Sequence, residues 1–282
     1  SRETFILTNN WFMIFFLATV LIGMLYPIFL DVLTNVKISV GPPFFNIVII
    51  PLVIPLLFLM AIGPKFGWVK SQNKIVKKIL FLILGATIIN LFIFYFFGKY
   101  SLLSNLIFIA AIFLILHSIL EIIKFFNKKK KPELPRIVSH LGFGLLVFFI
   151  GINHQFSLEM DFNLKAGEIK KINNYEINFE DIKIKDSKNY QAIIGKFKLT
   201  NLKNNSVEYL DPEIRIYSNP ETLTYEAAIK TKITSDLYLT MSNVSRSDYY
   251  NIKFQNKPFM IWIWLSALMI ASGGFMYLTS KK

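Results

Sequence analysis

The chain has three histidines, His117, His140 and His154, and the first two lie within strongly apolar stretches. Ionisable side chains are costly in hydrocarbon, so a histidine inside a membrane span indicates a functional site by default. His140 lies about one turn inside a short apolar segment, Arg136 to Asn153. The alternative is an imidazole that is simply hydrogen-bonded to a neighbouring helix. The residues alone leave both interpretations open.

His117 and Glu121 are four residues apart, and this spacing places them on one face of a helix. Such a pair could conduct protons for redox chemistry at the inner side of a membrane, or it could form a structural hydrogen bond near the interface. His154 lies 14 residues after His140, which is about 21 Å along a helix. These two histidines therefore cannot bind the same metal ion, and we expect His154 to be an ordinary interfacial residue.

The segments that must position these residues are membrane spans. Hydrophobic residues make up 54% of the chain, 28 residues are Phe, and the mean hydropathy is positive. A span needs about 20 apolar residues. Six stretches qualify: about 11–30, 44–62, 79–97, 102–123, 136–153 and 258–278.

The long polar segment between the fifth and sixth spans predicts a β domain. Residues 175–184, 191–200 and 207–217 alternate between apolar and polar side chains, and turn-forming Asn, Asp, Ser and Pro residues separate them. Alternation with period two, bounded by turns, is typical of antiparallel strands with one buried face. We therefore expect an α-helical multi-pass membrane protein with an inserted periplasmic antiparallel β domain.

The net charge of +13 lies mainly in short loops. In the segment from Asn153 to Lys257, basic and acidic residues are nearly equal in number. The excess of positive charge elsewhere therefore indicates the orientation of the chain in the membrane and not nucleic-acid binding. We predict residues 1–152 as five spans with basic cytoplasmic loops, 153–257 as the periplasmic domain, and 258–282 as the last span and cytoplasmic tail. Cysteine is absent, which excludes disulfides and thiolate metal sites within the chain. The start at Ser1 without methionine suggests a fragment or one piece of a split protein.

Several short motifs, in order along almost the whole chain, resemble one known family. They are Ser1-Arg-Glu-Thr4, Leu25-Tyr-Pro27, Ile38-Ser-Val-Gly-Pro-Pro43, Ser139-His-Leu-Gly142, Glu226-Ala-Ala-Ile229, Asp236-Leu-Tyr238 and Trp262-Ile-Trp264. Together they are similar to the C-terminal part of CcmF, the haem lyase family of cytochrome c-type biogenesis. The tryptophan-rich external haem-binding segment of that family has no counterpart in this chain.

The resemblance implies a function in cytochrome c maturation. CcmF takes haem, its substrate, from the haem chaperone CcmE and attaches it to the CxxCH thiols of apocytochrome c, with a CcmH-type thiol component as a further partner. The family also holds an intramembrane haem b between two histidines. His140 matches the later of these two axial ligands, and the earlier one belongs to the missing N-terminal part or its split-gene equivalent. A bacterial inner membrane is expected, or the mitochondrial inner membrane if the gene is organellar.

The residues alone are also compatible with a second class of function. Six spans and isolated histidines are also compatible with a non-catalytic transporter subunit, or with a membrane anchor that displays a β interaction domain. Whether the chain takes part in catalysis is therefore uncertain from its sequence. An absorbance scan of the purified protein for the Soret band of a b-type haem separates the two classes.

The clustered lysines predict the orientation of the chain in the membrane, because short loops on the cytoplasmic side are enriched in Lys and Arg. Reporter fusions at Ser71 and Lys130 should give cytoplasmic signals, and a fusion at Asn204 should give a periplasmic signal. A cytoplasmic signal from Asn204 would overturn this topology.

Overall fold

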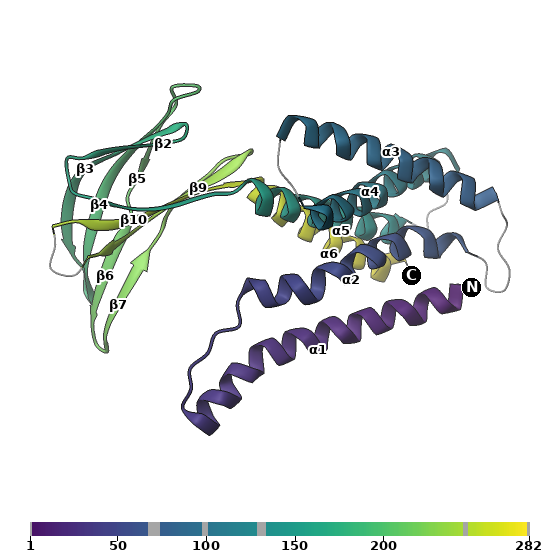
Figure 1. Ribbon diagram of the computed structural model, residues 1–282, viewed down its shortest axis with the longest axis horizontal. Coiled ribbons are helices and arrows are strands. Elements are labelled where there is room, and N and C mark those ends of the chain that lie inside the picture. The colour runs from purple at the N-terminus through teal and green to yellow at the C-terminus, as the bar shows by residue number, and fades with distance from the viewer. Residues whose placement is uncertain (1, 67–73, 98–100, 129–133, 245–247, 281–282) are drawn as a thin grey trace. The chain divides into compact units, whose positions relative to one another are not determined.

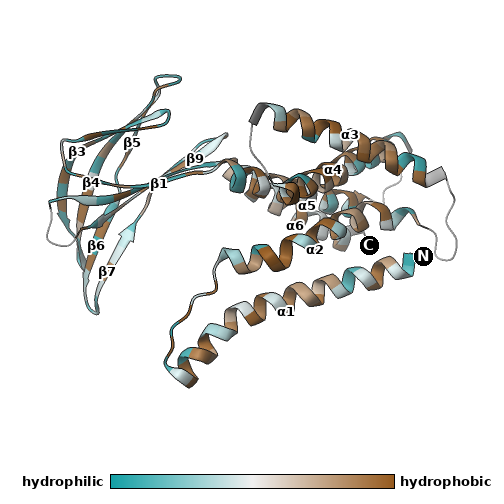
Figure 2. Cartoon of the chain, viewed as in Figure 1, coloured by the Kyte–Doolittle hydropathy of each residue, from teal (hydrophilic) through white to brown (hydrophobic). Residues whose placement is uncertain are grey.

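In the part of the chain that the structure describes, six helices are long and apolar enough to cross a membrane. The computed structural model describes residues 2–66, 74–97, 101–128, 134–244 and 248–280 (Figure 1). Its helices are α1 (Arg2–Thr34), α2 (Pro42–Ile62), the short 3₁₀ helix η1 (Gly63–Lys65), α3 (Lys74–Phe97), α4 (Leu102–Lys128), α5 (Leu134–Phe156) and α6 (Met260–Ser280). Brown, apolar residues dominate all six long helices (Figure 2). The predicted fold class, six apolar helices with an antiparallel β domain inserted before the last one, is confirmed.

The first two helices are longer than the sequence predicts. The connection expected from Asp31 to Pro43 shrinks to residues 35–41, because α1 extends to Thr34 and α2 begins at Pro42. Pro42 and Pro43 thus start a helix, in addition to ending the extended linker before them. Proline fits the first turn of a helix because its missing N–H would have no intrahelical partner there.

Helix α4 is the centre of the helical unit, which comprises residues 1–151 and 263–282. Half of the residues in its apolar 18-residue stretch are buried, whereas between a tenth and a quarter are buried in the corresponding stretches of the other five long helices. Both α2 and α3 pack on α4. The buried core consists of Leu57, Ala61, Leu82, Ala86 and residues 110–114 of α4.

Helices α5 and α6 approach each other closely through small residues. A Cβ atom at Gly273 of α6 would lie 2.7 Å from the carbonyl oxygen of Pro135 and 2.8 Å from the backbone nitrogen of Ser139. The Ser139 hydroxyl donates a hydrogen bond to the Ile270 carbonyl at 3.3 Å. Small residues let helices in a membrane approach until their backbones nearly touch. Gly273 therefore helps to hold the part of α5 that carries His140.

The β unit, residues 152–262, is built from two antiparallel sheets. One sheet has the strand order β1-β10-β9-β8. The other has the order β2-β3-β4-β6-β7, with β5 paired to β4. The strands are β1 (Leu158–Leu164), β2 (Ile169–Ile172), β3 (Tyr175–Asp186), β4 (Tyr190–Asn201), β5 (Val207–Leu210), β6 (Glu213–Ser218), β7 (Glu221–Glu226), β8 (Ala228–Thr231), β9 (Ser235–Asn243) and β10 (Tyr250–Pro258).

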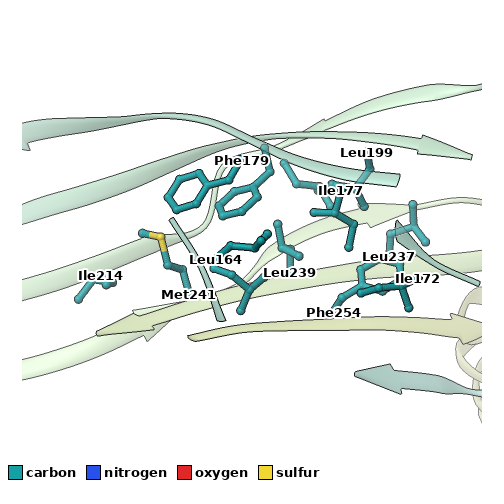
Figure 3. Close-up of a cluster of buried hydrophobic side chains, with 13 residues drawn as sticks. Leu164, Ile172, Ile177, Phe179, Leu199, Ile214, Leu237, Leu239, Met241 and Phe254 are labelled. Atoms are coloured by element: carbon teal, nitrogen blue, oxygen red, sulfur yellow. The ribbon is translucent and has the colours of Figure 1, made fainter. Parts of the chain in front are cut away.

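The core of the β unit lies between the two sheets, as period-two alternation requires (Figure 3). Phe179 of β3 and Phe197 of β4 are cross-strand partners, and their rings stack 4.2 Å apart. The predicted run 207–217 is two strands, because Asp211 and Pro212 interrupt it. The predicted turns at Asn173 and Asn205 form as expected, and both residues have positive φ angles of 48° and 53°. Asparagine tolerates this left-handed conformation.

Two adjacent glycines of α6 allow a matched test of the contact between α5 and α6. Gly273→Ala should destabilise the helical unit by about 1–3 kcal/mol, because the added methyl group meets backbone atoms of α5. Gly274→Ala should be nearly neutral, since nothing lies within 4 Å of a Cβ atom there. Thermal unfolding of the chain in detergent measures both, and equal effects would contradict the packing described here.

Candidate functional site

Glu121 is a buried carboxylate in the middle of an apolar helix. It lies on α4 and is 8% exposed. The Lys65 Nζ atom is 2.8 Å from Glu121 Oε1, and the Arg136 Nη1 atom is 3.0 Å from Oε2. Hydrogen bonds to charged groups are shorter and stronger than neutral ones. One carboxylate therefore joins η1, α4 and α5.

His117 is close to this cluster without being strongly bound to it. Its Nδ1 atom lies 3.9 Å from Glu121 Oε2, too far for a hydrogen bond. The ring is 6% exposed and packs beside Phe113, with 6.3 Å between ring centroids. His117 and Glu121 lie on one face of α4, as predicted. The carboxylate is bound by Lys65 and Arg136, however, and not by the histidine. This geometry does not favour a proton-conducting pair.

His140 lies one turn after Arg136 on α5, and both residues line a cavity of about 230 Å³. The cavity is bounded by α1, the end of α2, η1 and α5. Its wall combines apolar side chains with a few polar ones: Phe5, Ile6, Leu59, Met60, Gly63, Pro64, Arg2, Asn9, Arg136 and His140. His140 is half-buried, and it lines the cavity together with Met60 at the end of α2.

This cavity has one imidazole in a mainly apolar wall. A small number of polar side chains in a mainly apolar wall is typical of cofactor sites. In the part of the chain that the structure describes, no three His, Asp or Glu side chains gather into a metal-binding cluster. His140 therefore offers one nitrogen ligand, and His117 is not part of the cavity wall.

His154 is exposed near the other end of α5, which is one continuous helix from Leu134 to Phe156. The structure thus agrees with the prediction that His140 and His154 occupy different ends of one helix. The loops in which Ser71 and Lys130 lie fall outside the described residues. The predicted orientation consequently stays a prediction.

Sequence reasoning missed the partners of Glu121. Lys65 appeared to belong to a solvated lysine-rich loop, yet its side chain is 28% exposed and reaches the Glu121 carboxylate. Arg136 appeared only as the first residue of the fifth predicted span. Its position four residues before His140 was a usable signal, because this spacing puts both side chains on one helix face.

Three comparisons with known proteins agree on one family. Residues 155–258 match the family model described as the CcmF C-terminal beta-sandwich. The whole chain is 28% identical to cytochrome c-type biogenesis protein CcmF of Pseudomonas fluorescens and 28% identical to CcmF of Escherichia coli strain K12, covering 44% of each. The protein NrfE of Haemophilus influenzae is 22% identical over 97% of the chain.

A solved structure of the cytochrome c heme lyase CcmF has the same fold. It superposes on 99% of this chain with a TM-score of 0.77 at 19% identity, and the match covers 46% of that protein. The resemblance of the sequence to the C-terminal part of CcmF is therefore confirmed. The chain spans less than half the length of the curated relatives it matches.

The Glu121 cluster predicts a specific stability effect. Glu121→Gln should destabilise the helical unit by about 1.5–3 kcal/mol, because Lys65 and Arg136 lose their shared counter-charge. Glu3→Gln is the control, since Glu3 is exposed on α1 and should change stability by less than about 0.5 kcal/mol. Thermal unfolding in detergent separates the two variants, and a neutral Glu121→Gln would show that the cluster contributes little.

Proposed function

We propose that this chain acts in cytochrome c maturation as the C-terminal part of a CcmF-type membrane haem lyase. The observation that carries the proposal is similarity to CcmF proteins along the entire chain, through both the helices and the β unit. In this reaction, the vinyl groups of haem are joined to the two CxxCH thiols of apocytochrome c. The haem is the substrate, and the chain works in a bacterial inner membrane, or a mitochondrial one if the gene is organellar.

His140 is proposed to be one axial ligand of a resident intramembrane haem b. The residues fit this role, because a histidine nitrogen is a common axial ligand of haem iron and the surrounding wall is mainly apolar. Arg136, which is bonded to Glu121, lines the same cavity. A haem b bound there supplies one-electron chemistry, which would keep the iron of the incoming haem reduced.

The second axial ligand is proposed to come from outside this chain. His117 is directed into the packed interior beside Phe113 and Glu121, and it does not line the cavity that His140 lines. His154 is near the far end of α5. The remaining part of a CcmF protein, on a separate chain or a longer one, is therefore the proposed source of the second imidazole and of the external haem platform.

The proposed partners follow from the roles that this chain and the rest of CcmF are given. We infer that the chain assembles with the N-terminal part of CcmF, receives haem from a CcmE-type chaperone, and meets a CcmH-type thiol component together with apocytochrome c. The β unit carries charged residues of both signs on its surface, and these suit contacts with soluble partners. The Glu208 carboxylate, for example, is bound by Lys232 and Lys230, at 2.8 and 3.4 Å.

Absorption spectra of the co-expressed complex test the proposal. With the N-terminal part of CcmF present, His140→Ala should remove or strongly weaken the Soret band of haem b, because it removes an iron ligand. His117→Ala and His154→Ala are the matched controls and should leave the band in place. The chain expressed alone should insert into the membrane but carry little haem. A spectrum that depends on His117 and not on His140 would reverse the assignment.

A further inference from the structure

The buried core of the β unit stops before the end of the larger sheet. Met241 of β9 and Ile214 of β6 lie at one end of the core cluster (Figure 3). Met241 packs directly on the larger sheet, because its sulfur lies 2.8 Å from the position that a Cβ atom of Gly195 on β4 would take. Strand β9 ends only two residues later, at Asn243. Met241 therefore marks the level at which the smaller sheet stops covering the larger one.

Apolar side chains continue past this level on the inner face of the larger sheet. Ile193, Ile214 and Tyr225 are cross-strand partners on β4, β6 and β7, and the next row pairs Ile216 with Leu223. Partners directly opposite each other lie on the same face of a sheet. Ile214 is fully buried, whereas Tyr225, Leu223 and Ile216 are 48%, 45% and 36% exposed. The apolar face thus extends from the core into solvent along β6 and β7.

Strand β7 is also an edge of this sheet. It pairs with β6 on one side, and no strand in the described part of the chain pairs with its other side (Figure 1). Its residues on the inner face are Glu221, Leu223 and Tyr225. An edge strand has unpaired N–H and C=O groups that can hydrogen-bond another extended segment. β7 therefore offers a free backbone edge next to exposed apolar side chains.

The charges along this edge favour a basic partner. Within the described residues, Glu221 has no ion pair, and it lines a cavity of about 500 Å³ together with Asp186 and Lys188. The Asp186 carboxylate accepts a hydrogen bond from the Gln191 side chain at 2.8 Å, which leaves its charge unpaired. Two carboxylates and one lysine thus give this end of the sheet an acidic balance.

The same charges disfavour a second copy of the chain as the occupant. If two β7 strands paired in full antiparallel register, Glu221 of each copy would lie opposite Glu226 of the other. Like charges directly opposite each other destabilise a strand pair. Charged residues on edge strands commonly prevent such self-pairing, while the edge stays open to a segment of opposite charge.

We propose that the β7 edge binds an extended segment of a partner polypeptide, which joins the larger sheet as a further strand. Alternate side chains of a strand point to one face. Two apolar residues of the segment, two positions apart, lie beside Tyr225 and Leu223, and a Lys or Arg two positions further lies beside Glu221. Main-chain hydrogen bonds supply affinity in this mode of recognition, and every second side chain supplies specificity. The site requires no haem and is independent of the role of His140.

A designed peptide tests this interaction with the full chain. The probe is a fluorescein-labelled peptide of sequence Arg-Thr-Val-Thr-Val-Thr-Arg, which presents the pattern in both strand directions. The chain is held in nanodiscs of phosphatidylcholine, a lipid without net charge. Fluorescence anisotropy should show saturable binding that empty nanodiscs do not show. A peptide that does not bind in this way would overturn the proposal.

Methylation of the peptide backbone separates strand addition from other kinds of adhesion. Successive residues of a strand direct their N–H groups to opposite edges, so only every second N–H can reach β7. N-methylation of one alternate set should abolish binding. N-methylation of the other set should change the affinity by no more than about twofold, because those groups remain in water. Equal effects of the two modifications would contradict strand addition.

Substitutions in the chain identify the surface. Leu223→Thr and Glu221→Lys should each weaken peptide binding by about fivefold, the first through lost apolar contact and the second through repulsion of arginine. Both positions are exposed, so the core stays intact. Ile169→Thr is the matched control, since Ile169 is exposed on β2 at the opposite edge of the same sheet. An equal loss in Ile169→Thr would place the peptide elsewhere and overturn the proposal.

Self-association is the competing outcome, and Glu221→Lys separates it by sign. Between two copies, the new lysine would face Glu226 of the other copy and strengthen pairing, whereas it should weaken binding of the basic peptide. Analytical ultracentrifugation of the chain in detergent should show no dimer that depends on Leu223. A dimer that Leu223→Thr abolishes and Glu221→Lys strengthens would assign the edge to a second copy and overturn the proposal.

Discussion

Polar groups inside a hydrocarbon layer must find their partners within the protein, and this constraint organises the helical unit. Glu121 meets it with Lys65 and Arg136, each about 3 Å from one of its oxygens. The Asn90 side-chain amide donates to the Asn105 oxygen at 3.0 Å and joins α3 to α4. Each pairing links different helices, so the requirement to satisfy a buried group also determines which helices are neighbours.

The same constraint places specific polar contacts among the apolar side chains around His140. Arg136, which lines the same cavity as His140, is bonded to the Glu121 carboxylate of α4 at 3.0 Å. The wall of this small cavity contains His140 and two arginines, Arg2 and Arg136. A mainly apolar wall with a few polar side chains is typical of a binding site for a small molecule or cofactor.

The β unit depends on a different physical principle. Its sheets enclose a core of side chains such as Phe179, Phe197 and Phe254, each fully buried, so that hydrophobic burial and cross-strand stacking hold it together. Two antiparallel sheets with a core of their own form a unit that can be inserted between α5 and α6 in the sequence without changing how the helices pack. This independence agrees with the fact that a family model describes the β segment on its own.

The sequence by itself determined the membrane spans, the period-two strands and the turns at Asn173 and Asn205, because these follow from local composition and periodicity. It also singled out His140, through an isolated imidazole in an apolar segment and a motif that resembles CcmF. Only the tertiary structure decided what surrounds His140. Lys65, Arg136 and Glu121 lie on three segments separated by up to 71 residues, and the cavity that His140 lines also takes residues from α1 and from the end of α2. Long-range ion pairs and shared cavity walls leave no periodicity in the sequence. Such contacts arise only when packing brings the segments together.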